Sequence, residues 1–498
     1  MRFSTAAVLG LLVPGLSAMS VIPIQLELPV DFKPPQVFKN TNLVRNTNLE
    51  KGYVRETVNV VVENVDKQPQ TDYYIPFPAE VFERVGGFEA RDKNAVDKGR
   101  LAVDTTEVDS LSGKQYYVVH FPEPLAPKSQ ITLGISYSLL SSLNPRPATI
   151  QQSDKQYLSY SFSAYVPSVY KTETQKTKIK FPGINVPEIA QTSGLKSGSD
   201  PERKGSTWTY GPYNTAKVAP GTEYPLTVRY EFTNPVITAS LLERDLEVSH
   251  WGGNLATEER YWLRNNGSQL AKQFNRVEWT FSAYQQLPSS ALRELAYPLR
   301  PGSVDPYFID DIGNVSTSRY RPGTSKKPAN LELRPRYPVF GGWNYSFRVG
   351  WNNNLASFLR VAQAPNSYVL KVPFLEGPKV PEGIQYERVF VRVILPEGAH
   401  NVNFQIVEGS TTNGLPDRKQ IFYTITGFKT YLDTLGRTTL NLDVDSLTDE
   451  ARDSELVITY EYSTWDALRK PITIFAGVLS AFFAAWAIGK IDVSIKQR

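Results

Sequence analysis

Two seven-residue stretches decide the fold: Leu226-Thr-Val-Arg-Tyr-Glu-Phe232 and Leu456-Val-Ile-Thr-Tyr-Glu-Tyr462. Both alternate along the chain as β-strands with one buried face do. A second pair precedes them in the same order, Lys178-Ile-Lys-Phe-Pro-Gly-Ile-Asn-Val186 and Arg392-Val-Ile-Leu-Pro-Glu-Gly-Ala-His-Asn-Val402. Convergence of strand-like sequences is one explanation, but the shared order favours an internal repeat. We therefore predict two β domains that meet at Thr233-Asn-Pro235.

Further period-two runs lie on both sides of these stretches. They are 57–63, 116–121, 131–139, 157–162, 368–374 and 388–395. Helical patterns are short and are predicted at 289–296, 355–362 and 448–452. The 36 Pro, 27 Tyr and 24 Phe also suit strands and turns. The predicted class is mainly β, with two tandem β-sandwich-like domains and short helical insertions.

The C-terminal stretch Pro471–Gly489 contains no charged residue. At about 1.5 Å per residue, a helix of this length matches the thickness of a bilayer core. We predict a transmembrane helix at 469–490, with Pro471 in its first turn, followed by a tail at 491–498. Small residues recur every fourth position and predict a ridge for helix–helix packing: Gly477, Ala481, Ala485 and Gly489.

The N-terminus has the pattern of a secretory signal peptide, predicted at 1–20. Arg2 precedes a short apolar run, and Ala18-Met19-Ser20 provides a cleavage site of small residues. Delivery into the lumen gives two luminal domains, 21–235 and 236–468, on a single-pass type I membrane protein. Three glycosylation sequons become relevant there, at Asn266, Asn314 and Asn344, and the polar surroundings of Asn314 favour it most.

Motifs that carry chemistry are few. The chain has no cysteine, three histidines without metal-ligand spacing, and a net charge of only +4. Asp443-Val-Asp445 is one D-x-D pattern that could bind a divalent ion, although a solvated strand edge explains it as well. We predict no catalytic residue, no metal site and no cofactor.

Five strings resemble the ribophorin I family, the large subunit 1 of the oligosaccharyltransferase complex. They are Glu247-Val-Ser-His-Trp-Gly252, Asp311-Ile-Gly-Asn-Val-Ser-Thr-Ser318, Arg334-Pro-Arg-Tyr-Pro-Val-Phe-Gly-Gly-Trp343, Ile394-Leu-Pro-Glu-Gly-Ala399 and Tyr431-Leu-Asp-Thr-Leu-Gly-Arg437. The resemblance spans nearly the whole luminal part and is strongest in the second domain. From these strings we select five structural or contact residues: His250, Trp251, Arg334, Arg336 and Trp343.

The resemblance implies a non-catalytic, structural or substrate-presenting subunit in the endoplasmic reticulum membrane. The complex transfers a preassembled oligosaccharide from dolichyl diphosphate to Asn in N-x-S/T of nascent proteins. Implied partners are the multi-pass catalytic subunit, the other subunits, nascent polypeptides and, as a further candidate, the translocon.

Two other functions fit parts of the sequence. A cell-surface adhesion or receptor-like β-sandwich protein would reach the plasma membrane and would not copurify with glycosylation enzymes. A membrane-anchored luminal glycosyltransferase would use Asp443 and Asp445, and its isolated luminal domain would be active. Neither alternative accounts for the five strings.

Overall fold

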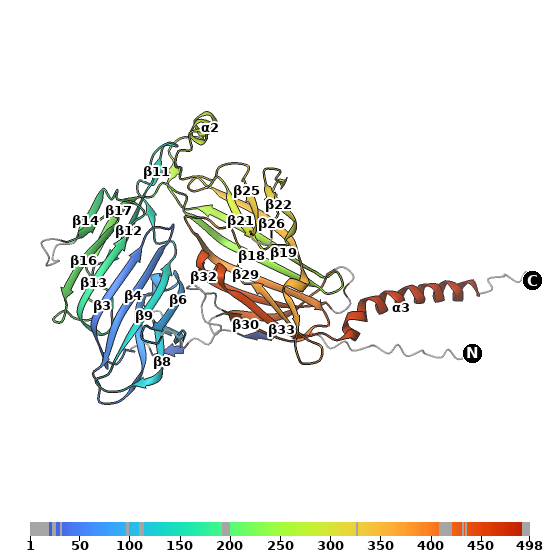
Figure 1. Ribbon diagram of the computed structural model, residues 1–498, viewed down its shortest axis with the longest axis horizontal. Coiled ribbons are helices and arrows are strands. Elements are labelled where there is room, and N and C mark those ends of the chain that lie inside the picture. The colour runs from blue at the N-terminus through green and yellow to red at the C-terminus, as the bar shows by residue number, and fades with distance from the viewer. Residues whose placement is uncertain are drawn as a thin grey trace, which may run out of the picture.

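The computed structural model describes residues 19–21, 26–29, 32–95, 99–108, 114–191, 200–324, 327–407, 421–430, 433 and 436–490. Most of the predicted signal peptide and all of the predicted tail lie outside these ranges. The described part is mainly β, with few helices, as the sequence predicts. Two β domains stand side by side and one long helix leads away from the second (Figure 1).

The first domain is built on a mixed seven-stranded sheet with the order β15-β16-β13-β3-β4-β9-β6. Its strands are β3 (Phe38–Asn48), β4 (Val54–Asn64), β6 (Val85–Asp92), β9 (Gln130–Leu139), β13 (Lys171–Lys180), β15 (Glu202–Lys204) and β16 (Thr207–Asn214). Strand β4 alternates between buried and half-buried positions, and Val58, Val60 and Val62 face the core. This burial follows the period of two read from the sequence.

Two four-stranded sheets share the core of the first domain with that sheet. One has the order β2-β7-β8-β5, with β2 (Leu26–Leu28), β5 (Gln70–Pro78), β7 (Ala102–Val108) and β8 (Lys114–Leu125). The other has the order β10-β12-β17-β14, with β10 (Asn144–Pro145), β12 (Tyr157–Ser163), β14 (Glu188–Gln191) and β17 (Pro225–Glu231).

The second domain is built on a mixed nine-stranded sheet with the order β1-β31-β32-β29-β18-β19-β26-β22-β23. Its strands are β1 (Met19–Val21), β18 (Ile237–Ser249), β19 (Asn254–Asn265), β22 (Val304–Asp310), β23 (Gly313–Asn314), β26 (Asn344–Asn354), β29 (Ile384–Glu397), β31 (Phe422–Phe428) and β32 (Arg437–Thr448). Strand β1 contains Met19 and Ser20 of the predicted cleavage site, and Ala18 lies outside the described residues.

Two smaller sheets complete this domain. One has the order β21-β25-β24, with β21 (Leu295–Leu299), β24 (Arg319–Arg321) and β25 (Ala329–Leu333). The other has the order β27-β28-β33-β30, with β27 (Leu359–Val361), β28 (Ser367–Pro373), β30 (His400–Val407) and β33 (Glu455–Glu461).

The two domains repeat one topology. In each, a parallel pair (β3 with β13, and β18 with β29) is flanked by antiparallel strands in equivalent order. The sequence echoes fall on equivalent strands, β13 with β29 and β17 with β33. Val236 belongs to the first hydrophobic core and Ile237 to the second.

The domains contact each other directly. Gly52 donates its backbone N–H to the Glu382 carbonyl at 2.7 Å, and Gln385 donates to the Gly52 carbonyl at 3.0 Å. At another point, β11 (Thr149–Ile150) pairs in parallel with β20 (Gln269–Leu270). These contacts involve backbone groups of both domains, so they depend on the path of the backbone as well as on side chains.

Short helices account for the differences from the predicted elements. Within the described ranges, the helices are α1 (Ala79–Phe82), α2 (Arg276–Tyr284), α3 (Thr464–Gly489) and the 3₁₀ turns η2 (Leu355–Ser357) and η4 (Asp449–Asp453). The helix predicted at 289–296 is wrong. Leu292 instead exchanges backbone hydrogen bonds with Val339 and is buried, so tertiary packing overrides the local pattern. Helix α2 was not predicted, although Asn275 caps it.

Candidate functional site at the base of the membrane helix

Helix α3 begins earlier than the sequence suggested. Ser463 and Asp466 form a capping box at its N-terminus, so the helix starts at Thr464 and Pro471 lies inside it, not in its first turn. The helix is long and apolar enough to cross a membrane. Nothing lies within 4 Å of where a Cβ of Gly477 or Gly489 would stand.

Pro471 explains the position of Trp251. A proline cannot donate to the carbonyl four residues earlier, so Pro471 leaves the Ala467 carbonyl without its helical partner. The indole Nε1 of Trp251 donates a hydrogen bond to that carbonyl at 2.9 Å. Trp251 lies at the turn between β18 and β19 and is 67% exposed. The hairpin turn of the second domain therefore completes the hydrogen bonding of the membrane helix.

Three of the five family-like strings meet at this point. Residues 247–251 of the first string, Pro396 and Glu397 of the second and Arg437 of the third line a pocket of about 530 Å³ together with the first turns of α3. Gly398 has φ +97°, and a Cβ there would stand 2.7 Å from Oδ1 of Asp466. Glycine at this position lets the β29–β30 turn lie against the helix cap.

Ion pairs hold the pocket walls together. Arg437 pairs with Glu247 and donates to the carbonyls of Val248 at 2.9 Å and Leu395 at 3.2 Å. Lys470 of α3 pairs with Asp433. Burial alone would raise the pKa of Asp433, but the Lys470 and Thr430 contacts outweigh it and lower that pKa. Neither Arg437, which ends a quoted string, nor Lys470, which precedes the apolar run, was predicted from the sequence as a contact residue.

His250 is packed among tyrosines next to the pocket. Its Nε2 lies 2.7 Å from the Tyr460 hydroxyl, and its ring contacts the rings of Tyr368 and Tyr462. Burial lowers the pKa of His250, which favours the neutral imidazole. These contacts are those of a structural residue that supports the β18–β19 turn.

Arg334, Arg336 and Trp343 lie in other parts of the second domain. Arg336 pairs with Asp310 and donates to the carbonyls of Gly313 and Asn314, so it fixes the β22–β23 turn. Arg334 is exposed and lies 3.5 Å from Glu294. Trp343 packs on the rings of Phe274, Phe340 and Tyr337. The structure thus separates these three residues from His250 and Trp251.

The D-x-D pair lies on β32 at a cleft of about 1070 Å³ between the domains. Arg388 on the neighbouring strand reaches Asp443 with two nitrogens, Nε at 2.9 Å and Nη2. This pairing neutralises Asp443 and occupies the oxygens that a cation would need. Among the described residues, no group of three or more His, Asp or Glu side chains has a metal-binding arrangement.

The three sequons differ in accessibility. Asn314 and Asn344 are exposed. Asn266 instead donates its Nδ2 to Thr238 at 2.9 Å. The hydroxyl of Ser268, the third residue of that sequon, is directed to the Pro147 carbonyl of the first domain at 2.9 Å.

Taken together, fold and site define a protein of two repeated β domains, the second fastened to one helix able to span a membrane. The chain belongs to the ribophorin I family, whose model matches residues 38–489.

Curated relatives carry one name. Dolichyl-diphosphooligosaccharide–protein glycosyltransferase subunit 1 of Caenorhabditis elegans is 30% identical over 87% of this chain and 69% of that protein. Subunit 1B of Arabidopsis thaliana is 29% identical, over 89% and 91%. Subunit 1 of Schizosaccharomyces pombe is 27% identical, over 83% and 86%.

The overlap with solved structures is small. Native leukotriene A4 hydrolase from Saccharomyces cerevisiae overlaps with 40% of this chain and 31% of that chain, at 10% identity and a TM-score of 0.27.

Proposed function

We propose that this chain is a subunit of the dolichyl-diphosphooligosaccharide–protein glycosyltransferase, which glycosylates Asn in N-x-S/T of nascent proteins. The observation that carries the proposal is the family match over residues 38–489, together with relatives of the same name in three organisms. The chain acts as a structural and substrate-presenting subunit, and the chemistry belongs to another, multi-pass subunit.

The arrangement of charges supports a non-catalytic role. At the base of α3, Arg437 and Lys470 are each paired with a carboxylate of the second domain. In the cleft between the domains, Arg388 neutralises Asp443. A carboxylate that accepts two contacts from one arginine has fewer lone pairs free to bind a divalent ion. The alternative of a glycosyltransferase centred on Asp443 and Asp445 is therefore disfavoured.

The membrane helix supplies the attachment and the contacts. We place the two β domains in the lumen of the endoplasmic reticulum and the C-terminus in the cytosol. The ridge of small residues permits close packing against spans of partner subunits: Gly477, Ala481, Ala485 and Gly489. Replacing Gly477 and Ala481 with Leu should lower the yield of the intact complex, while Val478→Leu, which lies off the ridge, should not.

Purification of the tagged full chain in mild detergent tests the proposal. We expect the catalytic subunit to copurify, and no transfer of oligosaccharide by this chain alone. Plasma-membrane localisation without copurifying glycosylation enzymes would establish the adhesion or receptor alternative. Activity of the chain alone, lost on Asp445→Ala, would establish the glycosyltransferase alternative.

Glycan occupancy tests the luminal placement. We propose that Asn314 and Asn344 are modified and that Asn266 is not, because its sequon is engaged at the domain contact. A gel shift after Asn314→Gln and after Asn344→Gln, but not after Asn266→Gln, is the expected result. No shift for any of the three would show that these sequons are unused and would contradict the proposed occupancy.

A further inference from the structure

Each domain buries one arginine at an equivalent position. Arg45 on β3 and Arg244 on β18 each lie four residues after the β-bulge in their strand. Each also donates from Nη2 to the carbonyl of the last residue of an equivalent strand, Ser163 of β12 or Pro373 of β28. Arg45 is 4% exposed and Arg244 is fully buried. The two guanidinium groups therefore have matching backbone surroundings.

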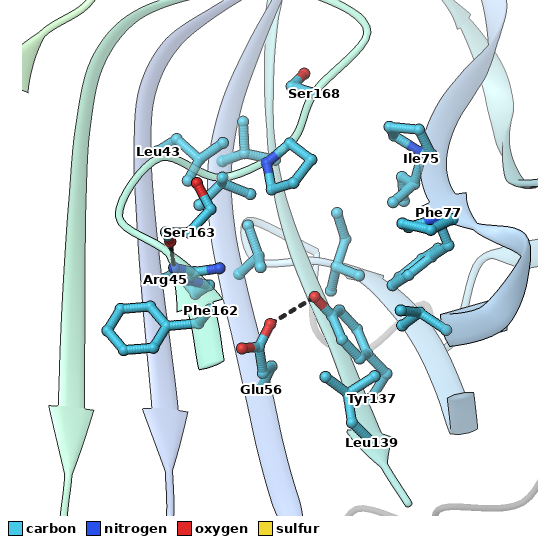
Figure 2. A pocket seen from close by; sticks show the side chains of 18 of the residues that line it. Leu43, Arg45, Glu56, Ile75, Phe77, Tyr137, Leu139, Phe162, Ser163 and Ser168 are labelled. Carbon is cyan, nitrogen blue, oxygen red and sulfur yellow. Dashed lines mark hydrogen bonds between the residues drawn. The ribbon is translucent and has the colours of Figure 1, made fainter. Parts of the chain in front are cut away.

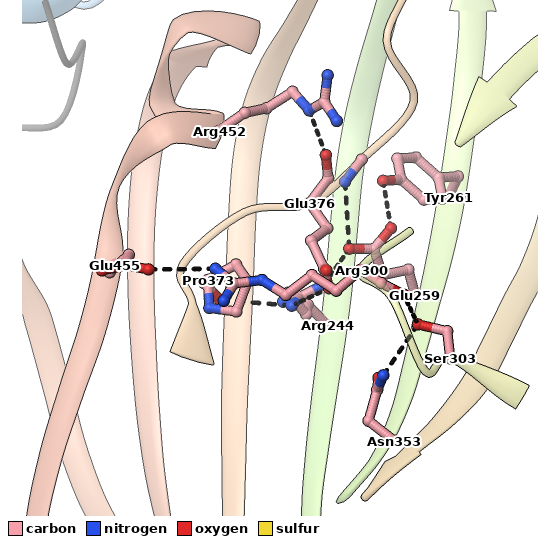
Figure 3. Close-up of polar contacts among 11 residues, drawn as sticks. Arg244, Glu259, Tyr261, Arg300, Ser303, Asn353, Pro373, Glu376, Arg452 and Glu455 are labelled. Atoms are coloured by element: carbon pink, nitrogen blue, oxygen red, sulfur yellow. Dashed lines mark hydrogen bonds and ion pairs between the residues drawn. The ribbon is translucent and has the colours of Figure 1, made fainter. Parts of the chain in front are cut away.

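In the second domain, the arginine is neutralised within the chain (Figure 3). Arg244 pairs with Glu259 of β19 and, at 2.8 Å, with Glu376. Glu259 also accepts the Tyr261 hydroxyl at 2.8 Å. Burial would lower the pKa of Arg244, but the two carboxylates outweigh it and raise that pKa. The cation and both anions form one closed cluster.

In the first domain, Arg45 has no such partner. Among the described residues, no Asp or Glu oxygen lies within 4.0 Å of a nitrogen of Arg45, the distance of an ion pair, and the buried Nε of Arg45 has no hydrogen-bond partner. The buried carboxylate of Glu56, on the adjacent strand β4, accepts three hydroxyls: Thr47 at 3.1 Å, Tyr137 at 2.7 Å and Tyr160 at 3.1 Å. The buried cation thus lacks the direct ion pair that its counterpart has, although the Glu56 anion lines the same cavity.

A cavity of about 200 Å³ lies beside Arg45 (Figure 2). Its walls are mainly apolar and include Leu43, Ile75, Phe77 and Leu139. Besides Arg45 and Glu56, one charged residue lines it, the exposed Glu223. A cavity of about 150 Å³ is enough for a molecule the size of benzene. The first domain therefore has room for a small apolar body next to an unpaired cation.

The first domain has a position equivalent to that of Glu376. Glu376 follows Pro373, the end of β28, by three residues, and Val166 follows Ser163, the end of β12, by the same number. Val166 lines the cavity. The repeat therefore places valine in the first domain where the second domain has the carboxylate that neutralises its arginine.

We propose that this cavity is a binding site for a small monocarboxylate with an apolar body, whose carboxylate pairs with Arg45 as Glu376 pairs with Arg244. The ligand accepts from the guanidinium and its apolar part packs between β5 and the β3–β4–β9 surface. The inference does not depend on the proposed membership of the glycosyltransferase.

Strand β5 favours a small molecule over an added peptide strand. It is the edge strand of its sheet. Its Tyr74 N–H is taken by the Tyr170 hydroxyl at 3.1 Å, and Pro76 and Pro78 have no N–H to donate. An incoming strand would find few donors along this edge.

Binding of phenylacetate to the full chain in lipid nanodiscs tests the site, with phenylacetamide as the uncharged ligand of the same shape. Isothermal titration should show phenylacetate binding at least about tenfold more tightly, since a hydrogen-bonded charge pair is worth about 1.5 kcal/mol or more. Arg45→Met should abolish this preference. Equal binding of the two ligands, no binding of phenylacetate, or an unchanged preference in Arg45→Met would each overturn the proposal.

Substitutions at Val166 test the same site even if Arg45→Met fails to fold. Val166→Glu should supply the missing carboxylate, raise the melting temperature and abolish phenylacetate binding. Val166→Gln is the control of equal size without charge and should melt at a lower temperature than Val166→Glu. A lower melting temperature for Val166→Glu than for Val166→Gln, or unchanged phenylacetate binding in Val166→Glu, would overturn the proposal.

Discussion

The two domains share a topology but use equivalent parts differently. The β3–β4 turn of the first domain contacts the second domain through Lys51 and Tyr53, both bonded to Asp449. The β18–β19 turn of the second domain contacts the membrane helix through Trp251. Each hairpin turn thus contacts the part of the chain that follows its domain, the second domain in one case and helix α3 in the other.

The buried arginines differ in the same sense. In the second domain, which connects to the membrane helix, the arginine is closed in by two carboxylates. In the first domain, farther from the helix along the chain, the equivalent arginine borders a cavity. The two domains therefore share their sheet order and a buried arginine. They differ in the loop after β12 or β28, which supplies a carboxylate to the arginine in the second domain and lines a cavity in the first.

The largest effect should come from removing the arginine of the closed cluster. Arg244→Met leaves Glu259 and Glu376 buried without a cation, so we expect a loss of about 3–5 kcal/mol in the stability of the second domain. Arg45→Met breaks no ion pair and should cost the first domain less. Hydrogen exchange of core amides, read separately in each domain, measures both. An equal or larger loss for Arg45→Met would contradict the comparison.

A smaller loss should follow from giving the second domain the residue of the first. Glu376→Val removes one of the two carboxylates on Arg244, and we expect a loss of about 1.5–3 kcal/mol, the usual range for a hydrogen bond to a charged group. Glu376→Gln keeps the size and an acceptor oxygen, and should lose less. Urea unfolding followed by hydrogen exchange in the second domain distinguishes the two. Equal losses would mean that the charge of Glu376, and not its size or its acceptor oxygen, stabilises the cluster.

The domain contact through Tyr53 should contribute less again. The Tyr53 hydroxyl donates to Asp449 at 2.6 Å, and Lys51 stays on Asp449 when that hydroxyl is removed, so Tyr53→Phe should cost about 1.5 kcal/mol. The control is Tyr230→Phe, because the Tyr230 hydroxyl is buried without a partner. Faster hydrogen exchange around η4 in Tyr53→Phe alone is the expected result. The same change in both variants would show that the hydroxyl contact is not responsible.

Much of this fold could be predicted from sequence, and the exceptions have physical reasons. The strands at 226–232 and 456–462 are nearly in place because one-sided burial fixes the register of a strand. The helix prediction at 289–296 was wrong because a short apolar pattern is compatible with a buried extended segment as well as with a helix. The prediction that Pro471 lies in the first helical turn was wrong because the capping box at Ser463 starts the helix before the apolar run begins.

The site was only partly predictable. Trp251 was singled out as a contact residue, and the structure gives it a partner that the sequence does imply, since Pro471 leaves the Ala467 carbonyl free. Arg437 and Lys470 were missed because their carboxylate partners are distant in sequence, and no local pattern identifies them. The sequence around Arg45 does not show that this arginine lacks an ion pair, because the partner of a buried arginine can be as distant in sequence as Glu376 is from Arg244.

The turn of the second domain provides the next smaller effect. Trp251→Phe leaves the Ala467 carbonyl without a donor, and we expect a loss of about 1 kcal/mol at the base of α3. Trp465→Phe is the control, because it removes an exposed indole from the same helix turn. Hydrogen exchange of the first two turns of α3 measures the effect. Equal exchange in both variants would show that the Trp251 bond does not stabilise the helix.

The smallest effect should be a pH dependence from His250, beside the same turn. Burial lowers its pKa in the folded chain below the ordinary 6.5, so the unfolded chain binds the proton more readily. The stability that the neutral ring contributes is complete above about pH 6.5 and is lost as the pH falls through the folded pKa. His250→Asn keeps a neutral partner for Tyr460 but does not titrate, so the loss between pH 7.5 and 5.5 should be smaller than in the natural chain. Melting temperatures at the two pH values measure it. An equal loss in both proteins would show that the proton is taken up by a group other than His250.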